Sequence, residues 1–273
     1  MDLSSDISIA ETLYRDKLEL YLGEIFRDVK IDSHGPEHHS RVWRNAKELL
    51  SYQQLAARFT GRTDALKILI GVYLHDSGMA MDPGPRHGQH SRNFCEKFLE
   101  QNKLERQEFS DLLDAIENHD KKDYKASATG NALLDIINIA DDLDAFGYIG
   151  IYRYLEIYLI RGTDYRDVGK MIITNVNSRF SNLVSIIDGI PSLVKQISPR
   201  VDVIISFFEK YNIRAAGYPF NTGRIEGYCG VAEIIGEMIK TGESLDDVTE
   251  KAVESTDRVI SLYFGELSKE LTL

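Results

Sequence analysis

All seven histidines of this 273-residue chain lie between His34 and His119. Asp76 directly follows His75, and an acidic run at 141–144 (DDLD) comes not far downstream. Imidazole and carboxylate groups are the ligands that borderline divalent ions prefer. Histidines that served only as structural filler would be spread over both halves of the chain. The clustering therefore favours a metal site.

The elements that must position this cluster are predicted to be helices, because apolar residues recur at steps of three and four along almost the whole chain. No alternating β-branched run bounded by turn residues is present. Two polar stretches that border histidines, Met79 to Gln89 and Lys121 to Asn131, have the composition of loops. The sequence therefore predicts an all-α fold. We expect helices at residues 9–26, 41–55, 64–74, 91–99, 109–119, 132–146, 148–160, 168–187, 191–211, 230–239 and 245–267.

Prolines should mark where these helices begin or break, because proline lacks the backbone N–H that a helix interior requires. The chain has only six of them. We expect helix starts or breaks at Pro36, Pro83, Pro85, Pro191, Pro199 and Pro219.

Composition excludes several classes of partner. The formal net charge is −11 and the isoelectric point is near 5.2, a balance that repels nucleic-acid backbones and anionic membranes. We therefore expect no nucleic acid polymer and no membrane as a partner. The only two cysteines, Cys95 and Cys229, are far apart in the sequence, which favours neither a disulfide framework nor a thiolate zinc site.

Length and terminal sequence bound the domain organisation. Residues 1–273 are expected to form a single domain, since 43% hydrophobic residues suffice for a sizeable core. The N-terminal stretch MDLSSDISIA lacks a basic segment followed by an apolar run. No apolar segment approaches the roughly 20 residues of a membrane span. A cytoplasmic protein is the expectation.

The spacing within the cluster places the candidate ligands on different helices. His38 lies at the start of an amphipathic helix, and His75 and Asp76 end an apolar one (ILIGVYLHD). Asp141 and Asp144 are three residues apart, on one face of a third helix. Side chains from several helices can thus converge at the centre of a bundle.

This arrangement resembles the HD-domain superfamily of metal-dependent phosphohydrolases. The match lies in HGPEHHSRVWRNA (with His38), YLHDSG (with His75 and Asp76) and IADDLDAFG (with Asp141), in the order typical of the superfamily. It covers about residues 25–150. The resemblance implies an HD-type helical bundle over that range, with a C-terminal helical extension over about 151–273.

The resemblance also implies a ligand set for one or two divalent ions, which would be Mn, Mg, Co, Ni or Fe. His87 and His119 match positions at which some members add ligands for a second ion, with Asp76 as the bridge. The alternative for these two histidines is a solvated or hydrogen-bonded side chain beside a loop. The full implied set is His38, His75, Asp76, His87, His119 and Asp141.

The activity implied by the resemblance is hydrolysis of a phosphoester by attack of metal-bound hydroxide. The expected substrate is a small phosphorylated metabolite, with nucleotides ahead of sugar phosphates. Asp76 would be catalytic as the bridging carboxylate. Asp144 would orient the attacking water or contact a sugar hydroxyl; alternatively it caps the helix or pairs locally.

Phosphate also needs cationic partners, and several basic residues lie close to the candidate ligands in sequence. The alternative for each is an ordinary solvated surface position. The candidate substrate-binding residues are Arg41, Arg86, Lys121 and Lys122.

Two other functions stay open at this point. A few HD-domain proteins that use all six ligands are similar to di-iron oxygenases, and the chain has the residues for that set. A non-catalytic nucleotide-binding sensor is the other alternative. The C-terminal half contains no motif that identifies chemistry, and it is a possible homodimer interface.

Overall fold

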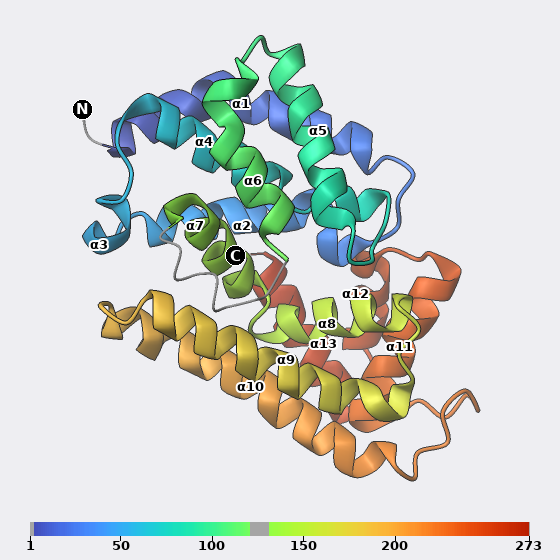
Figure 1. Ribbon diagram of the computed structural model, residues 1–273. Coiled ribbons are helices and arrows are strands. Elements are labelled where there is room, and N and C mark those ends of the chain that lie inside the picture. The colour runs from blue at the N-terminus through green and yellow to red at the C-terminus, as the bar shows by residue number, and fades with distance from the viewer. Residues whose placement is uncertain (1–2, 121–130, 273) are drawn as a thin grey trace. The chain divides into compact units, whose positions relative to one another are not determined.

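The fold is all-α, as the sequence predicted. The computed structural model describes residues 3–120 and 131–272. Within this part every regular element is a helix (Figure 1). The α-helices before residue 145 are α1 (Leu3–Ile25), α2 (Pro36–Leu49), α3 (Gln53–Ala56), α4 (Gly61–Leu74), α5 (His87–Gln101), α6 (Ser110–Asn118) and α7 (Ala132–Asp144). The later ones are α8 (Tyr148–Ile160), α9 (Tyr165–Ile186), α10 (Pro191–Ala215), α11 (Gly227–Thr241), α12 (Leu245–Val253) and α13 (Arg258–Leu271).

Three short 3-10 helices occur between them: η1 (Asp32–His34), η2 (Ser77–Ala80) and η3 (Arg106–Phe109). None of the described helices combines the length and the apolar character that crossing a membrane requires.

The chain divides into two compact units. The first unit consists of Met1–Val29 and His34–Leu143, and the second of Lys30–Ser33 and Asp144–Leu273. The expectation of a single domain over 1–273 stays a prediction.

The first unit is built around α4. Every residue from Ile68 to Leu74 is buried, so this half of the helix has no solvated face and must be surrounded. Helices α1, α2, α5 and α6 pack against it. A Cβ at Gly71 would lie 2.8 Å from side-chain atoms of Leu112 on α6 and Ile137 on α7, so these helices also approach it closely. The carboxyl end of α4 therefore emerges in the interior of the unit.

Helix α8 has the same central place in the second unit. All its residues from Ile149 to Ile157 are buried, and α9, α10, α11 and α13 pack against it. The carboxylate of Glu156 is buried with them and accepts hydrogen bonds from the backbone N–H of Ser33 (2.9 Å) and the hydroxyl of Tyr152 (2.7 Å). Burial raises the pKa of Glu156, and these two hydrogen bonds oppose that effect.

Two of the predicted helices are in fact interrupted. The segment expected at 41–55 ends as α2 at Leu49, and the hydroxyl of Ser51 donates to the carbonyl of Glu48 (2.6 Å), which competes with helix continuation. The segment expected at 245–267 breaks between α12 and α13. There the carboxylate of Asp257 accepts from the N–H groups of Val259 and Ile260 and begins a new helix.

The prediction that prolines mark helix starts or breaks is wrong for Pro199. Pro36 and Pro191 occupy the first turn of α2 and α10. Pro199 lies inside α10 instead of ending it. The helix continues because residues on both sides of Pro199, Ile197 and Val201 among them, are buried on its core face, while the proline itself is exposed. The burial outweighs the loss of one backbone hydrogen bond.

Candidate metal centre

Six of the residues singled out in the sequence come together inside the first unit. They come from the start of α2, the end of α4, the start of α5, the end of α6 and the last part of α7. All are at most 8% exposed. They are His38, His75, Asp76, His87, His119 and Asp141.

Four of these side chains could hold one ion. His38 Nε2 lies 3.7 Å from Oδ2 of Asp76 and 3.7 Å from Oδ1 of Asp141. His75 Nε2 lies 3.5 Å from Oδ2 of Asp76 and 3.9 Å from Oδ1 of Asp141. Ligand atoms that each lie about 2.0–2.2 Å from one ion are separated by about 3–4 Å. The four side chains thus have the separations of a coordination shell.

A second group shares Asp76 with the first. The other carboxylate oxygen, Oδ1, lies 2.9 Å from His119 Nε2 and 3.4 Å from His87 Nε2. Asp76 therefore presents one oxygen to each group. This is the geometry of a carboxylate that could bridge two ions.

Three of the histidines are oriented by the same kind of hydrogen bond to the backbone. The Nδ1 atoms of His75, His87 and His119 each hydrogen-bond to the carbonyl oxygen three residues earlier, at 2.9, 2.7 and 2.6 Å. Because a carbonyl can only accept, Nδ1 carries a proton in each ring, and Nε2 of each ring faces the cluster. Histidine ligands of metals are commonly fixed in this way.

One atom of the cluster makes no hydrogen bond at all. His75 is fully buried, and its Nε2 has no hydrogen-bond partner among the described residues. Such an atom costs free energy unless something coordinates it. A divalent ion would take this lone pair, so the residues present fit a metal.

Two glycines allow the backbone to bring these segments together. A Cβ at Gly78 in η2 would lie 2.0 Å from the carbonyl oxygen of His87 and 2.6 Å from the backbone nitrogen of Ser91. A Cβ at Gly88 would lie 2.6 Å from the carbonyl oxygen of Glu117. The absence of side chains at both positions lets α5 approach η2 and the end of α6, which places His87 beside Asp76.

Charge in the cluster is strongly coupled. Burial by itself would raise the pKa of Asp76, but His75, His119 and His38 hold it well below its ordinary value. Burial would lower the pKa of His119, but the hydrogen bond and charge of Asp76 raise it to about 9. In the metal-free protein at neutral pH, Asp76 is therefore ionised and His119 is protonated.

This coupling predicts a pH dependence of stability in the metal-free protein. The folded-state pKa of His119 exceeds its ordinary value of 6.5, so its contribution is fully present below pH 6.5 and is lost as the pH rises toward 9. The expected decrease in the free energy of unfolding is about 3 kcal/mol, because each pKa unit corresponds to about 1.4 kcal/mol. This decrease is measured by urea titrations at pH 6.5 and pH 9 in the presence of a chelator, with Trp43 fluorescence as the signal.

His119→Gln is the matched variant for this measurement, and its stability should fall much less over the same interval. Wild-type stability that is unchanged or increases between pH 6.5 and 9 would contradict the expectation.

The remaining predicted residues are placed differently. Arg86 is mostly exposed and its Nε donates to Asp82 (3.2 Å). Arg41 lies on α2 one turn after His38. Asp144 belongs to the second unit, where its carboxylate lies 3.3 Å from a guanidinium nitrogen of Arg153, which fits the local-pairing alternative. Lys121 and Lys122 lie outside the described residues.

Sequence reasoning overlooked one acidic residue at the site. Oδ2 of Asp120 lies 3.7 Å from Nε2 of His87, so this carboxylate borders the second group. Its position directly after His119 was the available signal. His34 and His39, which the sequence did not place, are buried beside the cluster, with ring centroids 5.5 Å from His38 and 5.4 Å from His75 respectively.

The comparisons with known proteins agree with this geometry. A family model described as HD-CE matches residues 13–191, a range that contains the whole cluster. Searches of curated proteins and of solved structures gave no significant match. The family match spans well over half of the 273 residues. With its helical bundle and its buried histidine and aspartate side chains, this chain belongs to the HD-CE family and contains an HD-type domain.

Proposed function

We propose that this protein is a metal-dependent phosphohydrolase that cleaves a phosphoester of a small phosphorylated metabolite, with nucleotides ahead of sugar phosphates. The observation that carries the proposal is the buried Asp76, whose two oxygens face two separate sets of histidines. A divalent ion at such a centre would lower the pKa of bound water and polarise phosphoryl oxygens.

In this proposal the residues of the cluster hold the metal ions, and backbone carbonyl groups orient the histidine ligands. His38, His75, Asp76 and Asp141 would hold one ion, and His87 and His119 would hold a second with Asp76 between them. The ions would be Mn, Mg, Co, Ni or Fe. The carbonyl groups that accept from Nδ1 of His75, His87 and His119 orient these rings, so that Nε2 of each would face a bound ion once His119 has released its Nε2 proton.

The proposed contacts with the substrate rest on sequence position and not on distances to the metal centre. Arg41 follows His38 by one helical turn, and Arg86 directly precedes His87, so both lie close in sequence to candidate ligands. We assign to them, and to Lys121 and Lys122, the binding of the substrate phosphate. A role of Asp144 in orienting the attacking water stays a prediction from the sequence.

The proposal is tested by phosphate release from a panel of nucleotides and phosphosugars, repeated with several divalent ions. We expect release that depends on the added ion and that is abolished in His75→Ala. Retained turnover in His75→Ala would defeat the proposed site.

The same panel separates the two alternative functions. Manganese, magnesium, cobalt or nickel supporting phosphate release would exclude the di-iron oxygenase, whereas iron loading with oxygen consumption would favour it. Binding of a nucleotide by metal-loaded protein that hydrolyses no phosphoester would favour a non-catalytic sensor. A cytoplasmic location and a homodimer stay predictions from the sequence.

A further inference from the structure

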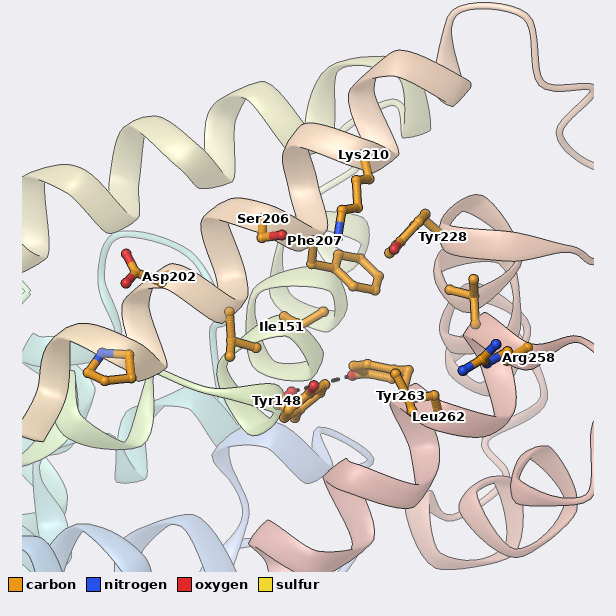
Figure 2. Close-up of a pocket in the computed structure, with 13 residues that line it drawn as sticks. Tyr148, Ile151, Asp202, Ser206, Phe207, Lys210, Tyr228, Arg258, Leu262 and Tyr263 are labelled. Atoms are coloured by element: carbon orange, nitrogen blue, oxygen red, sulfur yellow. Dashed lines mark hydrogen bonds between the residues drawn. The ribbon is translucent and has the colours of Figure 1, made fainter.

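The second unit contains a pocket of about 570 Å³ that the proposed function does not use (Figure 2). Its walls come from α8, α10, α11 and α13, and all its lining residues belong to the second unit. Small-molecule sites in proteins commonly have volumes of about 300–1,000 Å³. The pocket is therefore large enough for a metabolite of moderate size.

Aromatic rings form a connected part of the wall. The ring of Phe207 on α10 lies 5.1 Å from that of Tyr228 on α11 and 5.6 Å from that of Tyr263 on α13, measured between centroids. The ring of Tyr148 on α8 lies 6.2 Å from that of Tyr263. Rings held by their neighbours in this way offer faces and edges against which a planar ligand can pack.

Polar groups are arranged along one face of α10. Asp202, Ser206 and Lys210 follow one another at intervals of four residues, so they share a face of the helix. Eight residues correspond to about 12 Å along a helix axis, so the carboxylate and the ammonium group lie at opposite ends of this face. Figure 2 shows Asp202 and Lys210 separated in this way, with Ser206 between them.

The two cations of the pocket are available for a ligand. Lys210 Nζ lies 5.7 Å from the ring centroid of Tyr228, and Arg258 begins α13. Across the described residues neither of them forms an ion pair. Figure 2 shows Arg258 on the same side as Tyr228, away from Asp202. Both cations thus lie on the side of the pocket away from Asp202, with the ring of Tyr228 between them (Figure 2).

We propose that this pocket binds a nucleoside monophosphate. Lys210 and Arg258 bind the phosphate, the rings of Phe207, Tyr228 and Tyr263 pack against the base, and Asp202 accepts a hydrogen bond from a hydroxyl or amino group at the far end. The length of the polar face and the change of charge along it match a ligand with an anion at one end and a donor at the other. The proposal does not depend on phosphohydrolase activity.

The proposed binding of a nucleoside monophosphate is tested by isothermal titration calorimetry of the full chain in the presence of a chelator. The probes are adenosine monophosphate, adenosine and inorganic phosphate. We expect one bound adenosine monophosphate per chain, and at least tenfold weaker binding of each of the other two. Lys210→Ala should weaken binding by about tenfold or more, since a hydrogen bond to a charged group is lost. Lys195→Ala, an exposed lysine on the same helix, is the matched control and should bind normally.

Two further variants separate this pocket from the metal centre. Tyr228→Leu should weaken adenosine monophosphate binding, with an unchanged circular dichroism spectrum as evidence of folding. His75→Ala should leave the affinity for adenosine monophosphate unchanged. Absence of binding at millimolar ligand, adenosine binding as tight as the monophosphate, or binding that is lost in His75→Ala but kept in Lys210→Ala would each overturn the proposal.

Discussion

Replacing Asp76 with asparagine is expected to abolish retention of divalent ions and with it phosphate release. The substitution keeps the shape of the side chain but removes the negative charge that four buried histidines surround. Loss of even an outer-shell partner of a metal ligand costs about 10- to 100-fold in affinity, so the loss here should exceed about 100-fold. Metal content after dialysis, measured by mass spectrometry, gives a readout that does not depend on identifying the substrate.

Asp16→Asn provides the control, because it makes the same chemical change at an exposed position on α1. This variant should retain metal and activity at wild-type levels. If Asp76→Asn kept wild-type metal content, Asp76 would not be the residue that joins the two groups of ligands, and the proposed centre would be wrong.

Replacing Gly78 with alanine is expected to destabilise the first unit severely. The new Cβ would meet backbone atoms of His87 and Ser91 at 2.0 and 2.6 Å, and backbone cannot move aside as the end of a flexible side chain can. Overpacking costs about 1–3 kcal/mol and occasionally more. The hydrogen bond from the Gly78 N–H to the Ser91 hydroxyl (2.8 Å) is at risk as well, at about 1 kcal/mol.

Urea unfolding followed by fluorescence measures this effect, because Trp43 is the only tryptophan and is buried in the first unit. Gly23→Ala is the matched control on α1, where nothing lies within 4 Å of the new Cβ. That variant should gain about 0.5–1 kcal/mol, since alanine is the better helix former. A Gly78→Ala protein as stable as the wild type would show that α5 does not depend on this close approach.

Local patterns were sufficient to predict most of the helices. Helix α8 was predicted with the bounds that the structure has, because its apolar period is uninterrupted from Tyr148 to Ile160. The breaks at Ser51 and Asp257 were missed, since each depends on a side-chain hydrogen bond that competes with helix continuation. Pro199 was misplaced because burial of its neighbours overrode the cost of proline in a helix.

The sequence by itself determined which residue types were available for a metal centre. His75 and Asp76 follow an uninterrupted apolar run at 68–74, and a run without a polar face has to lie in the interior. The resemblance implied that His38 and Asp141 would join them, and in the structure the ligand atoms of all four side chains lie close enough together to hold one ion.

Only the tertiary structure decided how the two groups share their carboxylate. Which oxygen of Asp76 faces which histidine depends on side-chain torsions, and the approach of His87 depends on the close packing of Gly78 and Gly88 against other segments. These contacts join residues far apart in the chain, so periodicity cannot encode them. The pocket in the second unit is of the same kind, since only the fold brings Lys210 of α10 and Arg258 of α13 to the wall of one cavity.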